Sequence, residues 1–168
     1  MISALAAAEL KIRRVVIPPY PGLFSALGLL VADVKRIYRE TKFIPVVPGI
    51  ARTIDDTYAR MRSEAEIEFT KFGHSARDIV YDYALEMRFQ GQGLELLTSI
   101  DPDSLKRDDA AYLHEAFRAT HRARYGSASH AGSIEIVTFR LTAHVPTPAA
   151  VLTSLTQIKR DEGDALRD

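Results

Sequence analysis

Few polar residues of this 168-residue chain have the spacing that catalysis or ligand binding requires. The clearest candidates are Arg88 and Gln92, which lie at a predicted turn. The turn, Gly91 to Gly93, is not a dinucleotide-binding loop, because Leu96 stands where the third glycine belongs. We interpret it as a hairpin turn. For Arg88 and Gln92 two interpretations stay open, a ligand-binding pair or a solvated strand edge.

A second candidate is the loop that contains Gly22 and Ser25. Ser25 lacks the Gly-x-Ser-x-Gly spacing of a nucleophile elbow, and no positioned base is visible for it. The preferred interpretation is that Ser25 caps the helix that follows. Gly22 and the N-terminus of that helix could still face an anion. We therefore keep both residues as candidate binding residues and predict no catalytic residue.

Histidines and neighbouring carboxylates predict neither a metal site nor an acid–base pair. His114 and His121 do not have the i, i+4 spacing of helical metal ligands, so packed or capping histidines are expected. Asp55-Asp56 and Asp108-Asp109 are adjacent in sequence, so their side chains diverge on a helix. Negative charge at a helix N-terminus is the simpler account of these pairs.

Composition excludes several classes of function. Lys+Arg and Asp+Glu are both 22, so no basic surplus points to nucleic acid or an anionic membrane as a partner. The absence of cysteine excludes disulfides, thiolate metal sites and a cysteine nucleophile, and it fits a cytoplasmic protein. The most apolar run, Leu23 to Val34, is broken by Gly28 and Asp33 and falls short of the roughly 20 residues of a membrane span.

Hydrophobic periodicity predicts an α+β protein. The pattern from Ile79 to Phe89 alternates almost perfectly and is typical of a half-buried strand. Ile50 to Phe72 has an apolar stripe at helical spacing that ends on Phe72. Asp101 to Asp103 is expected to form a turn. The other expected elements are helices at Ser3 to Leu10, Leu23 to Val34 and Asp109 to Arg124, and strands at Val15 to Ile17, Arg36 to Val47, Leu94 to Thr98 and Ile134 to Val145.

Three stretches carry a family resemblance. Val16 to Leu30, with its prolines, Gly22 and Ser25-Ala26-Leu27-Gly28, resembles a segment of the large subunits of hydantoinase A and 5-oxoprolinase. Arg88 to Gln92 resembles the Arg-aromatic-x-Gly-Gln stretch of their C-terminal region. Glu135 to Thr142 resembles the last strand of that region. The resemblance covers roughly Ser3 to Val145 and includes the N-methylhydantoinase A and acetone carboxylase beta-like members.

The resemblance implies a parent hydrolase that uses ATP and magnesium to open cyclic amides. It also implies that the nucleotide site lies upstream, in an actin-like ATPase domain, so no cofactor is expected in this stretch. We expect residues 1–33 to be the last helix, strand and helix of that domain. Residues 34–146 would form a C-terminal α+β domain, an antiparallel sheet with two packed helices, and 147–168 a polar tail.

Two classes of function stay open. In the first, the chain is a C-terminal fragment that serves assembly or interdomain contacts, with the rest of the parent and a second, hydantoinase B-type subunit as partners. In the second, it is a stand-alone binding module. A parent that carboxylates a ketone is a further alternative to the cyclic-amide hydrolase. The fragment interpretation also predicts incomplete cover over Val15 to Ile17 and Leu23 to Val34, and hence self-association.

Overall fold

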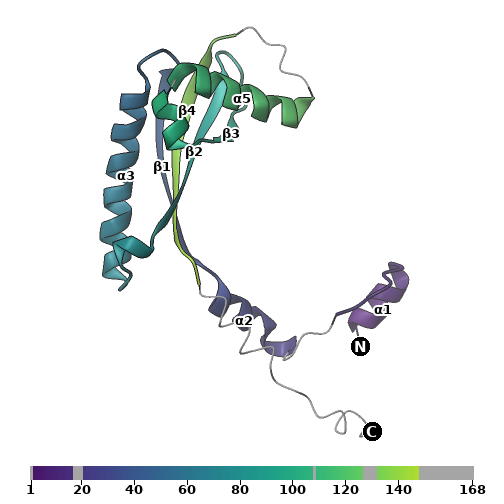
Figure 1. Ribbon diagram of the computed structural model, residues 1–168. Helices are drawn as coiled ribbons and strands as arrows, with labels where there is room; N and C mark the ends of the chain where they lie inside the picture. Colours follow the sequence, from purple (N-terminus) through teal and green to yellow (C-terminus); the bar gives the residue numbers. More distant parts are fainter. Residues whose placement is uncertain (1, 17–20, 108, 127–131, 148–168) are drawn as a thin grey trace, which may run out of the picture. The chain divides into compact units, whose positions relative to one another are not determined.

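A computed structural model describes residues 2–16, 21–107, 109–126 and 132–147. The chain divides into two compact units. The first comprises Met1–Ala32 and Thr147–Asp168, and the second comprises Asp33–Pro146. The second unit holds the sheet and its helices (Figure 1). Among the described residues, no helix is long and apolar enough to cross a membrane.

The second unit is built on a four-stranded antiparallel sheet in the order β1-β4-β2-β3. The strands are β1 (Val34–Pro45), β2 (Val80–Phe89), β3 (Leu96–Ser99) and β4 (Ile134–Val145). β2 and β3 form the predicted hairpin across the glycine-rich turn, where Gly91 has a φ of 84° that glycine adopts without strain. The expected α+β fold with an antiparallel sheet is confirmed.

Three helices contribute to the core on one face of this sheet. They are α3 (Ala51–Lys71), α4 (Pro102–Arg107) and α5 (Asp109–Tyr125). α3 runs alongside the strands, and α5 crosses them at one end (Figure 1). The apolar stripe predicted for α3 packs against this face of the sheet, because its spacing brings one residue to the sheet on each helical turn. Residues of these helices and of β2 and β4 form one buried cluster that includes Ile54, Tyr58, Met61, Leu113, Phe117, Leu85, Met87, Ile136, Phe139 and Leu141.

A bulge at Val137 decides which residues of β4 meet the helices. Ile136 pairs with Met87, while Thr138 pairs with the preceding residue of β2, Glu86, so Val137 is an extra residue on β4. Because strand side chains alternate between faces, the extra residue brings Ile136 and Phe139 to the same face. Both belong to the core cluster, whereas Val137 is buried but not part of it.

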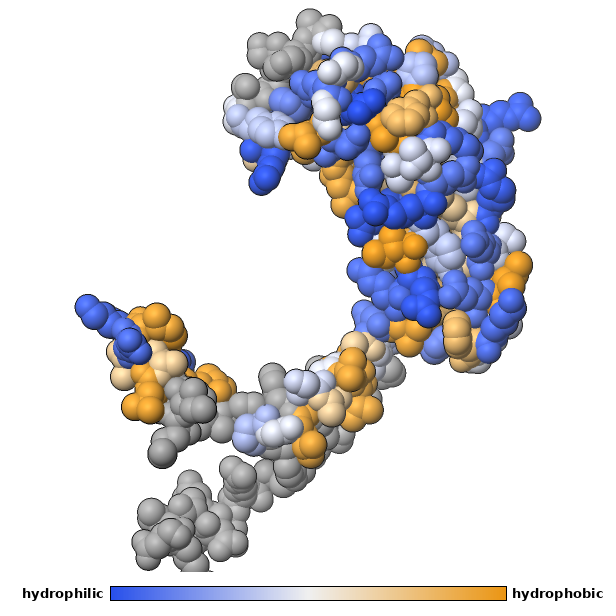
Figure 2. Space-filling view, turned by 180° about the vertical axis from the view of Figure 1, so that it is seen from behind, coloured by the Kyte–Doolittle hydropathy of each residue, from blue (hydrophilic) through white to orange (hydrophobic). Residues whose placement is uncertain are grey.

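The opposite face of the sheet, called the open face below, faces no helix of the second unit among the described residues. Paired residues of neighbouring strands share a face, so the strand register defines its members. Hydrophobic and hydrophilic side chains are interspersed over the surface of this unit in view in Figure 2. The open face carries Lys35, Ile37, Arg39, Thr41, Pro45, Val80, Asp82, Ala84, Glu86, Arg88, Leu97, Ser99, Glu135, Thr138, Arg140, Thr142 and His144.

Two predictions for the second unit were wrong in detail. Phe72 was placed at the end of the α3 stripe, but its side chain is 63% exposed. The helix ends at Lys71, so Phe72 no longer follows the helical spacing. The expected turn at Asp101 to Asp103 is instead the start of α4, because Pro102 suits a first helical position and Asp101 accepts hydrogen bonds from the first turn.

The first unit contains α1 (Ile2–Glu9), a short 3₁₀ turn η1 (Pro21–Leu23) and α2 (Phe24–Val31). The strand expected at Val15 to Ile17 is not formed at Val15 and Val16, and Ile17 lies outside the described residues. A lone extended segment has no ladder partner, so its sequence alone does not make it a strand. Of the predicted tail 147–168, only Thr147 is described, and its hydroxyl donates to the Ala32 carbonyl over 2.9 Å.

Several apolar side chains of the first unit are exposed, as the fragment interpretation expects. Val16 is 78% exposed, and Leu29 and Leu30 of α2 are 80% and 65% exposed. Figure 2 shows hydrophobic residues gathered on both short helices of this unit. α2 ends at Val31, and Val34, which was expected to continue it, begins β1.

We predict that the stability of the second unit depends on Phe139 far more than on Phe43. Phe139 is fully buried, whereas Phe43 is 63% exposed. Phe139→Ala should lower the free energy of unfolding by about 3–5 kcal/mol through lost burial and a cavity. Phe43→Ala should lower it by less than about 1 kcal/mol. Urea denaturation of both variants measures this, and equal losses would contradict the assigned faces.

Candidate functional site

A hollow of about 410 Å³ lies where the β2–β3 turn meets α5. Its lining is mostly apolar, which is the usual character of a ligand site. Gln92 contributes an amide at one side, so this predicted binding residue does reach a hollow. The lining residues are Gln92, Gly93, Leu94, Leu96, Phe117, His121 and Tyr125.

His121 is the chemically most versatile side chain of this hollow. Only 6% of it is exposed, and it packs among aromatic rings. Its ring centroid lies 4.8 Å from that of Tyr125 and 5.4 Å from that of Phe89. The expectation of a packed histidine is therefore confirmed for His121. Sequence analysis did not predict the hollow, although Phe117, His121 and Tyr125 recur every fourth residue and so share one face of α5.

Arg88 and Gln92 are not brought together. Phe89 packs against Phe117 on the helix-covered face, so the side chain of Arg88, one residue earlier, points to the open face. There Arg88 Nε donates to Glu135 over 2.7 Å and Nη1 donates to Glu95 over 3.2 Å. Its guanidinium also lies 5.5 Å from the ring centre of Phe43. These contacts join β2 to β4 and to the hairpin, and a binding role for Arg88 stays a prediction.

Gly22 and Ser25 lie in the first unit, in η1 and in the first turn of α2. Both are exposed. The predicted cap at Ser25 is wrong, because the helix begins at Phe24 and the cap position is Leu23, with no side-chain capping bond. Ser25 thus lies two residues after the cap position, too late to accept from the first free amides. A binding role for either residue remains a prediction.

A second hollow, of about 610 Å³, lies between β1 and α3. Glu40 of β1 contacts Arg60 of α3 across the hollow, and it also contacts Lys42 of its own strand. The hydrogen bond from Lys42 is the main reason that the pKa of Glu40 is lowered. Nearby, the Tyr38 hydroxyl donates to Glu68 over 2.6 Å, and this bond lowers the pKa of that carboxyl. These contacts hold α3 against the edge of the sheet.

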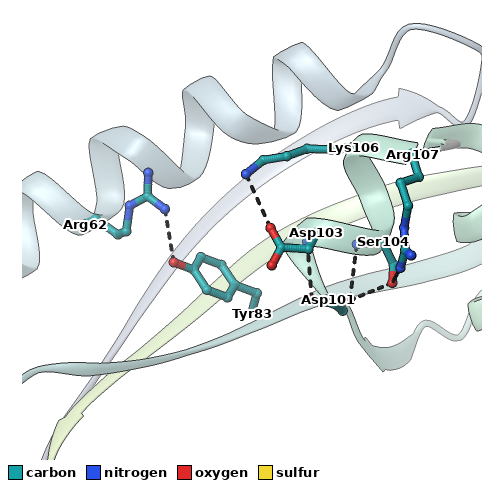
Figure 3. A network of polar contacts seen from close by, with 7 residues as sticks. All are labelled: Arg62, Tyr83, Asp101, Asp103, Ser104, Lys106 and Arg107. Carbon is teal, nitrogen blue, oxygen red and sulfur yellow. Dashed lines mark hydrogen bonds and ion pairs between the residues drawn. The ribbon is translucent and has the colours of Figure 1, made fainter.

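The polar contacts around α4 are also structural (Figure 3). The Asp101 carboxylate accepts from the Ser104 hydroxyl over 2.6 Å and from the Ser104 amide over 3.1 Å. The hydroxyl bond is the largest cause of the lowered pKa of Asp101. Figure 3 shows Arg62 and Tyr83 as a separate pair, joined by a 3.1 Å bond between α3 and β2.

Asp109 links the two long helices. One of its carboxylate oxygens accepts from the amide of Ala51, the first residue of α3, over 3.1 Å, and the other accepts from Ala110 over 2.7 Å. The bond from Ala51 is the largest cause of the lowered pKa of Asp109. The sequence interpretation, a charge at a helix N-terminus, is confirmed for Asp109, while Asp108 lies outside the described residues. Within the described ranges, no group of His, Asp and Glu side chains could hold a metal ion.

Comparison with known proteins shows what this arrangement is similar to. No protein-family model matches the chain. An uncharacterized protein of Methanocaldococcus jannaschii is 29% identical over 140 residues, which are 81% of this chain and 18% of the relative. The chain therefore spans about a fifth of the length of the relative that it matches.

Two solved structures share the fold. One is a nucleotide-free acetone carboxylase, from a study of ATP-dependent acetone carboxylation, with a TM-score of 0.65 and 20% identity over 79% of this chain and 20% of that chain. The other is an ATP-dependent caprolactamase of Pseudomonas jessenii, with a TM-score of 0.60 and 21% identity over 73% of this chain and 19% of that chain. The fold that the family resemblance implies is thereby confirmed.

We predict that Arg88 is needed for the strand pairing through Glu135. The side chain of Glu135 is 14% exposed, so the loss of Arg88 leaves a largely buried carboxylate without its partner. Arg88→Gln should lower the free energy of unfolding by about 1–3 kcal/mol. The double variant Arg88→Gln/Glu135→Gln should recover part of this loss in thermal unfolding. If the double variant recovers no stability relative to Arg88→Gln, the two side chains act independently.

We also predict that the capping by Asp109 depends on pH. Because the folded-state pKa is lowered, the carboxylate stabilises the fold above the ordinary pKa of aspartate, and this contribution is lost as pH falls through the lowered value. Asp109→Asn should therefore unfold at a lower temperature than the parent at pH 7, and the difference should shrink below about pH 4. Asp56→Asn, on the exposed surface of α3, serves as the matched control. If the difference in unfolding temperature between Asp109→Asn and the parent stays constant with pH, the capping role of Asp109 is contradicted.

Proposed function

We propose that this chain is the C-terminal part of the large subunit of an ATP-dependent enzyme that opens cyclic amides. Within that enzyme it serves assembly or interdomain contacts and does no chemistry itself. The observation that carries the proposal is the fold shared with about 20% of an acetone carboxylase and 19% of a caprolactamase, both of which are named as ATP-dependent. The family resemblance includes both branches, and the likeness to a caprolactamase supports the cyclic-amide branch.

The polar side chains support a role in assembly. Arg88 stabilises strand pairing, Asp101 and Asp109 stabilise helix ends, and Glu68 joins α3 to β1. Catalysis by paired acids and bases requires side chains that converge on one point. The apolar hollow beside α5 and the exposed apolar side chains of α2 are instead typical of surfaces that another polypeptide covers.

The partners in this proposal are the rest of the large subunit, which would hold ATP and magnesium in an actin-like domain, and a second, hydantoinase B-type subunit. Residues 1–33 would complete that domain, and Gly22 and Ser25 would lie at its border. A ketone carboxylase parent is the second candidate, and the 0.65 TM-score with acetone carboxylase favours it. A stand-alone binding module would need none of these partners.

Calorimetry with ATP and magnesium on this chain tests where nucleotide binds. We expect no saturable binding, because the helix termini and loops of the second unit present no phosphate-binding arrangement of glycines. Saturable binding at micromolar affinity would contradict the proposal and would direct attention to the loop around Ser25.

Reconstitution with the remaining large-subunit segment and the second subunit tests the assembly role. The mixture should hydrolyse ATP when a hydantoin, 5-oxoproline or a lactam is supplied, and this activity should fall at least about tenfold when the chain is left out. ATP use that instead needs bicarbonate and acetone would favour the carboxylase. A mixture that is equally active without the chain would favour the stand-alone module.

A further inference from the structure

The open face of the sheet has an uneven distribution of charge pairs. Towards one end, Arg88 is held by Glu135 and Glu95. Near the middle, Arg39 reaches across β4 to Glu86. The carboxylates in these pairs already bind an arginine, so little negative charge is left on this face for another basic side chain.

Arg140 lies at the centre of the open face and has no such partner. It is half-buried on β4, with Arg39 directly opposite on β1 and Ala84 directly opposite on β2. Among the described residues, no carboxylate pairs with its guanidinium. The diagonal carboxylates already have contacts, since Glu86 pairs with Arg39 and Asp82 lies 3.7 Å from His144.

An unpaired, half-buried guanidinium is unfavourable in the free protein. Its charge is partly removed from water, and the adjacent Arg39 carries the same charge. A carboxylate placed over Arg140 would relieve both effects, because guanidinium binds carboxylate through two parallel hydrogen bonds. The small side chain of Ala84 leaves room beside it for such a group.

Apolar side chains lie further out on the same face. Ile37, Val80 and Leu97 are 46%, 44% and 47% exposed, and they stand opposite Thr142, His144 and Glu86 of the neighbouring strands. The hydroxyl-bearing Thr138 and Thr142 flank Arg140 on β4 and are only 6% and 8% exposed. Arginine is enriched among the central anchor residues of protein interfaces.

We propose that the open face docks an acidic segment of another polypeptide, with an Asp or Glu carboxylate on Arg140 and apolar neighbours on Ile37, Val80 and Leu97. The proposal rests on the assembly role above and names the surface that performs it. A second copy of the chain would not fit, because a twofold pairing of this face would bring Arg140 near its own equivalent. A free anion would leave the apolar side chains of Ile37, Val80 and Leu97 uncovered.

Nuclear magnetic resonance titration of the full chain with defined peptides tests this surface. The probe is a short capped peptide, Leu-Thr-Glu-Thr-Leu, in which Glu and both leucines share one face of an extended chain, and its matched control has Gln in place of Glu. The glutamate peptide should shift the signals of the Arg140 guanidinium and of the methyl groups of Ile37, Val80 and Leu97. It should bind about tenfold more tightly than the glutamine peptide, in the high-micromolar to millimolar range.

Variants separate docking from folding. Arg140→Gln should remove the preference for glutamate without lowering the melting temperature, because no partner is lost. Arg140→Lys should keep part of the preference, since it keeps the charge but not the two parallel hydrogen bonds. Arg140→Glu should instead prefer a lysine peptide. Arg52→Gln, on the exposed side of α3, is the matched control and should bind as the parent does.

Four results would overturn the proposal. Acetate could bind Arg140 as tightly as the peptide, which would indicate a small-anion site. The same signals could shift with chain concentration alone, which would place a second copy on this face. No preference for glutamate, or a fall in melting temperature in Arg140→Gln, would remove the docking role. Because the titration needs no other subunit, these failures leave the reconstitution experiment as a separate test of the proposed function.

Discussion

The second unit depends on the pairing of β4 along both of its edges. β4 is the last strand in the sequence, yet it lies between β1 and β2 and joins the first strand to the rest of the sheet. Its pairing with β1 aligns Val34 with Val145, so the two ends of this unit meet. Without β4, β1 and α3 would be connected to the hairpin only through the helix core, and the helices would lose the face on which they pack.

Pairing on both sides also limits what β4 can carry. Its residues are nearly all buried or half-buried, so each polar side chain on it must have a use or a partner. The bulge at Val137 keeps both Ile136 and Phe139 in the core, while threonines and Arg140 occupy the other face. Charge pairs then connect the strands of the open face, and among the described residues the half-buried Arg140 has no carboxylate partner.

Sequence patterns predicted those elements whose burial is one-sided and regular. β2 and α3 follow their periods of two and 3.6 residues because each has one covered face, and β4 was predicted with its observed bounds. The patterns failed where distant residues decide the outcome. Val15 and Val16 have strand composition but no strand beside them in the described part of the chain, and Ser25 follows a helix start set by the preceding turn. The bulge and the isolation of Arg140 arise from register between strands, and the hollow arises where α5 packs beside the β2–β3 turn. One-dimensional spacing contains neither kind of information.

The arrangement along β4 connects these features to function. Its first residue, Ile134, pairs with Phe89 beside the aromatic hollow, and its last, Val145, pairs with Val34 where the chain enters and leaves the unit. Arg140 lies between these ends on the opposite face of the sheet from the hollow. Polar groups spread along a strand in this way do not converge on a reacting atom, as catalysis requires. In the proposed docking role, one long strand paired on both sides would fix the spacing of every group that the contact uses.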